Sequence, residues 1–288
     1  MSEASGFHDV YYDSADGLRL YARDYPHANT QLIPVLCLPG LTRNSKDFET
    51  INLDRRVITV DFRGRGLSQY AIDPATYRPD VELADTLALL QHLRIERVAV
   101  IGTSRGGLVG MLMATLQKDM LAGILLNDVG PVLQPQGLLR IRSYLGVAGN
   151  FTSWSEAVTA LKARNSGFES LSGPECLTFA RRLFKSVNGL PRMDYDPALL
   201  NNFASADDIA EGRIPELWEL FAATSEIPTA ILRGQNSDLL SASTVAEMQA
   251  RNPGLDATTI ANRGHAPFLD EPESIAAIHR WLTRVDAS

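Results

Sequence analysis

The sequence has few cysteines, few histidines and no long apolar run. Its two cysteines, Cys37 and Cys176, are far apart and do not form a CxxC pair, so we expect two reduced, buried thiols in a cytoplasmic protein. The opening residues, MSEASGFHDV, contain neither the basic region nor the apolar region of a secretory signal. No apolar run reaches the roughly 18 residues that a membrane span needs, so we expect no membrane association.

Positive charge is also scarce. The 288 residues include 27 Lys and Arg against 34 Asp and Glu, which gives a formal net charge of -7, and no run is rich in Lys or Arg. A chain this acidic is not expected to bind nucleic acid. His, Cys, Asp and Glu do not cluster at metal-ligand spacing, so we expect no metal and no cofactor. The sequence does not determine the oligomeric state and leaves a homodimer open.

What the chain does contain is the alternation of strands and helices that is typical of an α/β fold. A hairpin is predicted over 9–25, around the turn pair Asp16-Gly17. Further strands are predicted at 32–40, 55–63, 97–102, 121–128, 228–234 and 257–260, and helices at 80–93, 107–117, 242–251 and 272–285. This order predicts a parallel sheet with helices on both faces.

One long segment interrupts the alternation. Residues 132–226 contain helical patterns, such as SWSEAVTALKARN and ECLTFARRLFKSV, and no convincing strand. A chain of this length, with 45% hydrophobic residues, is large enough for one domain with an insert. We therefore predict a core domain formed by 1–131 and 227–288, into which 132–226 is inserted as a helical cap.

The stretch VAVIGTSRGG places a serine between a buried strand and a helix. Its residues 102–106, GTSRG, fit the pattern G-x-S-x-G. A sharp turn there pushes the central side chain out of the sheet, and glycines are needed on both sides because other side chains would collide with the turn. The helix that follows points free N–H groups and a partial positive charge at the same place. We therefore interpret Ser104 as a nucleophile and not merely as a helix cap.

A serine hydroxyl needs a base to take its proton, and His265 fits that role. It lies in NRGHAPFLDEP, between the last short strand and the last helix, and loops at the carboxyl ends of parallel strands line the ligand crevice. Asp238, in the loop after the strand at 228–234, is the acid expected to orient the imidazole. Asp128, at the end of the strand at 121–128, is the alternative acid.

A carbonyl oxygen that gains negative charge during the reaction needs N–H donors. The amide of Arg105, at the helix start directly after the serine, is one candidate. The other is the amide of Leu41 in CLPGLTRNSKDF, where Gly40 lets the backbone turn closely. Thr42 is the alternative to Leu41 for this second donor.

The glycine-rich stretch DFRGRGLS, residues 61–68, could suggest a phosphate-binding loop. It lacks the lysine spacing of a P-loop, and its glycines do not follow the strand-to-helix pattern GxGxxG. We interpret it as a turn in which Arg63 and Arg65 support neighbouring loops.

Together these motifs resemble the α/β-hydrolase fold superfamily. LCLPGLTRNSKDFE, VITVDFRGRGLS, VAVIGTSRGGL, LRGQNSDLLS and GHAPFLDEPESI occur in the order and spacing of its members, over nearly the whole chain. The resemblance implies a mostly parallel eight-stranded sheet with a helical cap between its sixth and seventh strands. It also implies a triad of Ser104, Asp238 and His265, with an oxyanion hole formed by the amides of Leu41 and Arg105. One departure is Pro39-Gly40, where many members have a His-Gly pair that helps to organise the oxyanion loop.

From these residues we expect a serine hydrolase that cleaves a carboxylic ester or a lactone of small to medium size through an acyl-enzyme on Ser104. Tyr144, Trp154 and Trp218, together with Phe168, are candidate walls of a substrate pocket in the cap. Two alternatives remain open. One is hydrolysis of a C–C bond in a β-diketone-like substrate by the same triad, and the other is a ligand receptor that uses this fold without catalysis.

Overall fold

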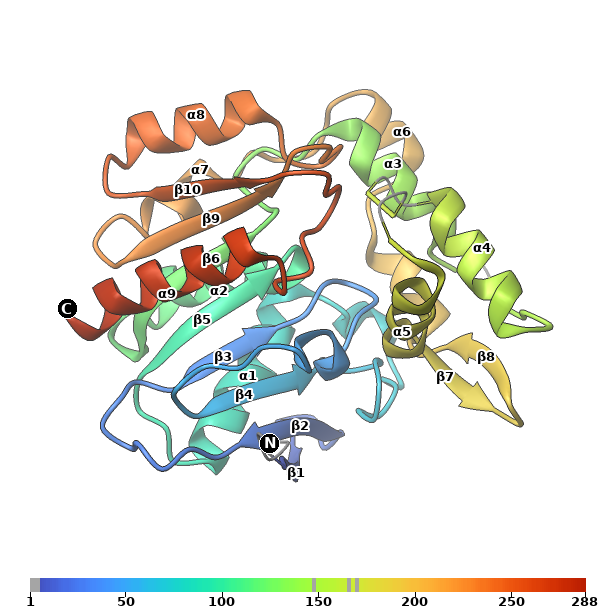
Figure 1. The fold of residues 1–288 in the computed structure, drawn as a ribbon, viewed down its shortest axis with the longest axis horizontal. Helices are drawn as coiled ribbons and strands as arrows, with labels where there is room; N and C mark the ends of the chain where they lie inside the picture. Colours follow the sequence, from blue (N-terminus) through green and yellow to red (C-terminus); the bar gives the residue numbers. More distant parts are fainter. Residues whose placement is uncertain (1–5, 147–148, 165–166, 169–170) are drawn as a thin grey trace.

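An eight-stranded sheet forms the centre of the computed structural model, which describes residues 6–146, 149–164, 167–168 and 171–288 (Figure 1). Its strand order is β1-β2-β4-β3-β5-β6-β9-β10. The bounds are β1 His8–Asp13, β2 Arg19–Tyr25, β3 Val35–Leu38, β4 Val57–Asp61, β5 Val98–Thr103, β6 Leu121–Asn127, β9 Thr229–Gly234 and β10 Asp256–Ile260. The β1–β2 and β2–β4 pairs are antiparallel and the other pairs are parallel, which confirms the predicted mostly parallel sheet.

The central strands are buried on both faces. Every residue of β3, β4 and β6 is buried, which explains why these segments read as continuous apolar runs and not as alternating ones. Two separate apolar clusters result, one on each side of the sheet. The strands therefore form a rigid layer whose carboxyl ends can hold polar loops in fixed positions.

Helices cover both faces, as predicted. On one face, α1 Pro79–His92 packs against α2 Arg105–Leu116, and α8 Ala242–Arg251 contributes Val245 and Met248 to the same cluster. On the other face, α9 Pro272–Asp286 packs along β6, β9 and β10. Phe48 of the short 3-10 helix η1 Ser45–Phe48 belongs to the same apolar cluster. Three further 3-10 helices are η2 Pro74–Thr76, η3 Lys118–Met120 and η4 Pro197–Asn202.

Most of the segment between β6 and β9 lies beyond one end of the sheet, and the segment carries most of the remaining helices (Figure 1). These are α3 Pro135–Tyr144, α4 Trp154–Arg164, α5 Gly173–Leu183, α6 Ala206–Ala210 and α7 Trp218–Ala222. The insertion thus follows the sixth strand of the sheet and precedes the seventh. Its last helix, α7, packs against α2 of the core, with Phe221 in the cluster of that face. The exact limits 132–226 stay a prediction.

The expectation that this segment contains no strand is wrong. A two-stranded antiparallel hairpin, β7 Phe184–Val187 and β8 Leu190–Met193, follows α5 directly. Asn188 and Gly189 form its turn with φ values of 52° and 79°. Asn-Gly is the preferred pair for a two-residue hairpin turn that needs positive φ at both positions. The apolar pattern missed the hairpin because β7 is mostly exposed, but the Asn-Gly pair was a usable signal.

In the described part of the chain, every helix is too short or too polar to cross a bilayer.

Candidate active site

The turn between β5 and α2 holds Ser104 in an unusual backbone conformation. Its φ is 50° and its ψ is -111°, a combination that a non-glycine residue adopts only under strain. Its amide donates to the carbonyl of Asn127 at 3.0 Å, and its carbonyl accepts from Gly107 at 2.9 Å. These bonds tie the turn to β6 on one side and to the start of α2 on the other, so the hydroxyl is presented from a fixed backbone.

The glycines on either side of this turn leave no room for a side chain. A Cβ on Gly102 would lie 2.6 Å from the backbone of Gly106. A Cβ on Gly106 would lie 2.1 Å from the carbonyl oxygen of Leu38 in β3. Real Cβ atoms do not approach other atoms so closely, and the obstacles here are backbone atoms that cannot rotate away. The predicted reason for the two glycines therefore agrees with the structure.

His265 comes from the loop between β10 and α9 and reaches the serine. Its Nε2 atom lies 3.0 Å from the Oγ atom of Ser104. The imidazole is mostly buried, with 9% of its side chain exposed. The structure thus brings together two residues that are 161 positions apart in the chain, in the geometry that a nucleophile and its base require.

The acid beside the imidazole is Asp128, and this corrects the expectation for Asp238. The Oδ2 atom of Asp128 lies 2.8 Å from Nδ1 of His265. Ser104, His265 and Asp128 therefore form one continuous chain of hydrogen bonds. Asp128 is the alternative acid that the sequence offered.

The surroundings of Asp128 account for its position. It follows β6 with a φ of 55°, and its own amide donates to Leu232 of β9 at 2.8 Å. One carboxylate oxygen accepts from the amide of Gly234 at 2.8 Å, and the other accepts from the hydroxyl of Ser237 at 2.6 Å. The fully buried carboxylate thus has three donors counting His265, which compensates the cost of burying its charge.

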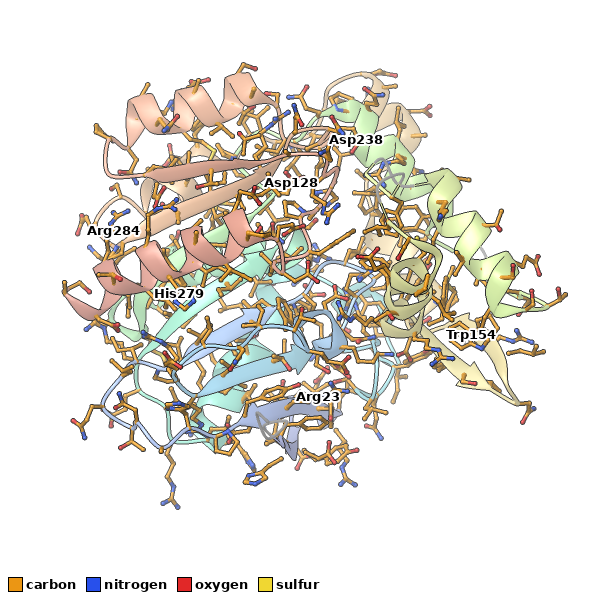
Figure 2. The ribbon with its side chains drawn as sticks, viewed as in Figure 1. Arg23, Asp128, Trp154, Asp238, His279 and Arg284 are labelled. Carbon is orange, nitrogen blue, oxygen red and sulfur yellow. The ribbon has the colours of Figure 1, made fainter. Side chains whose placement is uncertain are left out.

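Asp238 is held by a different partner. Arg140 of α3 donates to its carboxylate from Nε at 2.5 Å and from a terminal nitrogen at 2.8 Å. Burial alone would raise the pKa of Asp238, but the hydrogen bonds and charge of Arg140 outweigh burial and lower it below its usual value. Both aspartates lie at the edge of the sheet that faces the inserted segment (Figure 2). Asp238 fastens that segment to the core.

Asn127 is a residue of the site that the sequence analysis missed. Its buried amide nitrogen donates to the hydroxyl oxygen of Thr103 and to the carbonyl of Pro267, both at 3.0 Å. Thr103 precedes the serine and Pro267 follows the histidine by two positions. Asn127 therefore links the two loops that carry the reacting pair. A polar side chain at the end of a buried strand, next to Asp128, was the only signal in the sequence.

The loop after β3 passes next to the serine. A Cβ on Gly40 would lie 3.9 Å from Cβ of Ser104, and Leu41 and Thr42 line the same cavity as the serine. In the part of the chain that the structure describes, the amides of Leu41, Thr42 and Arg105 donate to no protein acceptor. They are free to bind an oxygen from a ligand. The structure does not separate Leu41 from Thr42, so the pair of Leu41 and Arg105 stays a prediction.

A largely apolar cavity opens beside Ser104 and His265, between the sheet edge and the inserted segment. Its aromatic walls are Phe48, Tyr144, Phe151, Phe168, Phe179, Phe184, Tyr195 and Phe268. Phe268, from the loop of His265, packs against Phe168 and Phe179 of the inserted segment with ring centroids 5.5 and 4.9 Å apart. The cavity is therefore built jointly by both parts of the chain.

Two of the expected wall residues lie elsewhere, which corrects that expectation. Trp154 is beside the β7–β8 hairpin, far from Asp128, and its indole nitrogen donates to Gly189 at 3.1 Å (Figure 2). Trp218 packs over the guanidinium of Arg251 at 3.8 Å from the ring centroid. Both rings make packing contacts away from the cavity. The presence of an aromatic residue in the inserted segment does not determine which way its ring points, so the sequence could not show this.

In the described ranges, His, Cys, Asp and Glu side chains form no group of three or more that could hold a metal ion.

Comparison with known proteins agrees with this geometry. The alpha/beta hydrolase family model matches residues 35–278. A 3-hydroxybutyrate-oligomer hydrolase of Cupriavidus necator is 35% identical over 259 residues, which cover 86% of this chain and 88% of that protein. Esterase YbfF of Escherichia coli is 28% identical over 80% of this chain and 83% of its own length. The crystal structure of an alpha/beta hydrolase from Novosphingobium aromaticivorans superposes with a TM-score of 0.88 at 42% identity, covering 99% of each chain.

Proposed function

Because this chain belongs to the alpha/beta hydrolase family, we propose that it hydrolyses carboxylic esters or lactones through an acyl-enzyme on Ser104. The observation that carries the proposal is the unbroken path of hydrogen bonds from the serine through His265 to Asp128. In this proposal Ser104 is the nucleophile, His265 the general base and Asp128 the acid. The amides of Leu41 and Arg105 supply the oxyanion hole.

The first half of the reaction forms the acyl-enzyme. Oγ of Ser104 attacks the ester carbonyl carbon while Nε2 of His265, 3.0 Å away, takes the hydroxyl proton. The buried Asp128 carboxylate holds the ring through Nδ1 and stabilises its charged form. The carbonyl oxygen becomes negatively charged and accepts from the two free amides. When the tetrahedral intermediate collapses, His265 returns the proton to the departing alcohol oxygen, and the acyl group remains on Ser104.

The second half releases the acid. A water molecule takes the place of the alcohol, and His265 removes one of its protons as the water oxygen attacks the acyl carbon. Collapse of the second intermediate breaks the bond to Oγ, which recovers a proton from His265. The net reaction adds one water across the ester bond and gives an acid and an alcohol. With a lactone, the two groups remain on one molecule.

The cavity supports a short, mainly apolar acyl or alcohol group. Its aromatic walls favour hydrocarbon, and two guanidiniums, those of Arg43 and Arg182, also line it. Arg43 is already bound by both carboxylate oxygens of Asp47. The side chain of Arg182 is 13% exposed, and its ion pair with Glu49 is long at 4.0 Å. Glu49 has a shorter ion pair with Arg23 at 2.7 Å, so Arg182 retains the capacity to bind a second carboxylate.

A cavity with aromatic walls and the Arg182 guanidinium favours one substrate class among esters. The Cupriavidus necator relative is named for oligomers of 3-hydroxybutyrate, which are short esters that end in a free carboxylate. We propose that this chain accepts short hydroxy-acid esters of that kind, with the apolar part in the aromatic cavity and the carboxylate at Arg182. Asp270 lies near enough to affect Arg182 electrostatically, so the carboxylate would have to compete with it.

The test is an activity screen with matched substrates. Purified protein would be offered p-nitrophenyl esters of increasing chain length, lactones of increasing ring size and 3-hydroxybutyrate dimer and trimer. The proposal expects ester turnover that Ser104→Ala reduces to background. Arg182→Met should lower kcat/KM for the carboxylate-ended oligomers while leaving the neutral esters nearly unchanged. Turnover of β-diketones above that of all esters would contradict ester hydrolysis, as would ester turnover that survives in Ser104→Ala.

A further inference from the structure

One buried carboxylate connects the two sides of the predicted oxyanion hole. Glu82, on the first turn of α1, lies between two guanidinium groups. One of its oxygens is 2.8 Å from a terminal nitrogen of Arg65, and the other is 2.9 Å from Nε of Arg105. Glu82 and Arg65 are fully buried, and the Arg105 side chain is 15% exposed.

Each arginine also holds a backbone segment of the site. Nε of Arg65 donates to the carbonyl of Leu41 at 2.8 Å. Arg105 carries the second predicted oxyanion amide in its own backbone, directly after the serine, and its side chain donates to the carbonyl of Tyr77 at 3.0 Å. The contacts therefore run without interruption from Leu41 through Arg65 and Glu82 to Arg105.

The guanidinium of Arg65 is also held by the turn from which it comes. Its Nη1 donates to the carbonyl of Arg63 at 2.6 Å, within the same turn. The adjacent Gly64 and Gly66 have φ values of 75° and 55°, and a Cβ on Gly66 would lie 2.0 Å from the carboxylate of Asp61. This turn can adopt only a narrow set of conformations, so the planar fork of the guanidinium is presented in one direction.

We propose that Glu82 and Arg65 are positioning residues that hold the Leu41 and Arg105 amides at a fixed separation for the oxyanion. The inference rests on the proposed function, since it concerns the same reaction. Oxyanion donors are effective because they are already in place when charge develops, and the loop that carries Leu41 follows a glycine. A buried carboxylate held by two guanidiniums joins that loop to the turn of the serine.

The chain contains a matched control for this role. Arg63, two residues before Arg65, forms an ion pair with Asp85 at 2.7 Å, and Asp85 is on α1 three residues after Glu82. This pair is as buried as the first one, with side chains 2% and 4% exposed. It contacts neither Leu41 nor Arg105, and its other carboxylate partner is Asp16. Disrupting it therefore perturbs the same turn and the same helix without reaching the oxyanion amides.

The experiment compares Glu82→Gln and Arg105→Met with Asp85→Asn, using the best ester from the screen. If the proposal holds, kcat falls by about 10- to 100-fold in the first two variants while KM changes little. The dissociation constant of a trifluoromethyl ketone, which forms an oxyanion with Ser104, should rise by the same factor as kcat/KM falls. Asp85→Asn should keep both quantities near the wild-type values even where its melting temperature is lower.

Arg65→Lys and the folded state of each variant complete the test. A lysine lacks the planar fork that contacts Leu41 through Nε and Glu82 through a terminal nitrogen, so the kcat of Arg65→Lys should lie between those of wild type and Glu82→Gln. If Glu82→Gln does not fold, Arg105→Met decides, because the Arg105 side chain is 15% exposed whereas Glu82 is fully buried. Unchanged kcat in folded Arg105→Met, or an equal loss in Asp85→Asn, overturns the proposal. These outcomes differ from those expected if the proposed function is wrong. In that case the wild-type protein would not turn over esters, or Ser104→Ala would remain active.

Discussion

Asp128 and His265 join the end of β6 to the loop before α9 through a hydrogen bond of 2.8 Å. The acid thus comes from the strand next to the one that carries the serine, since β5 and β6 are neighbours in the sheet. Ser104, Asp128 and Asn127, which links the loops of Ser104 and His265, all lie at the ends of this one strand pair.

Replacing each of the two aspartates distinguishes their roles. Asp128→Asn should lower kcat by about 10⁴-fold, because a neutral amide neither stabilises the charged imidazole nor enforces its tautomer. Asp238→Asn should lower kcat less than about tenfold. Its carboxylate binds Arg140 and not His265, in an ion pair whose side chains are 21% and 16% exposed. Steady-state kinetics at fixed pH checks both variants. A larger loss in Asp238→Asn than in Asp128→Asn would contradict the assignment of the acid.

Asn127→Ala should affect activity and stability together. The substitution leaves the buried carbonyl of Pro267 without its donor, which costs about 1–3 kcal/mol. It also frees the loop of His265, so kcat/KM should fall by about 10- to 100-fold. Thr103→Val is the comparison, because it removes only the bond on the serine side. Urea unfolding and kinetics would show a stability loss without any kinetic loss if the link were purely structural.

Asp16 makes stability depend on pH. Hydrogen bonds from Arg63 and Ser14 lower its pKa from 3.8 to about 2. A carboxyl whose pKa is lower in the folded state stabilises the protein above its unfolded pKa and loses that contribution as the pH falls through the folded value. The side chain of Asp16 is 48% exposed, so solvent screening reduces its contribution to about 1 kcal/mol.

Asp16→Asn should therefore destabilise the protein at pH 6, by an amount that shrinks steadily as the pH is lowered towards 3. Urea unfolding across this range measures the difference from wild type. Asp13→Asn, at an exposed position of β1, serves as the reference. A stability difference that stayed constant with pH would mean that Asp16 acts through packing and not through its charge.

Gly106→Ala should be among the most damaging small substitutions in the chain. The new methyl group would overlap the backbone of Leu38, so β3 or the serine turn must shift, at a cost of at least about 2 kcal/mol. Gly173→Ala is the control, because a Cβ there meets nothing within 4 Å. Calorimetry of both variants, with labelling of Ser104 by a fluorophosphonate, would check whether the turn is lost. Equal melting temperatures would refute the packing argument.

Much of the sheet could be predicted from the sequence because burial on both faces produces continuous apolar runs. The serine turn was also predictable, since glycine spacing reports a steric requirement that is local in sequence. The β7–β8 hairpin was not found because its mostly exposed first strand has no apolar alternation.

The choice between two acids could not be settled in the same way. Asp128 and Asp238 follow β6 and β9, which are adjacent parallel strands, so both side chains arrive at the same edge. What separates them is Arg140, which lies 98 positions before Asp238 and binds it across the boundary with the inserted segment. A contact between segments so far apart has no signature in either local sequence.

Phe268 belongs to the loop of His265, yet its ring packs on Phe168 and Phe179 of the inserted segment. A chimera that receives this segment from another hydrolase would therefore also lose the aromatic contacts that support the loop of His265. Exchanging specificity between relatives should succeed only when residues 263–271 are transplanted together with the insertion.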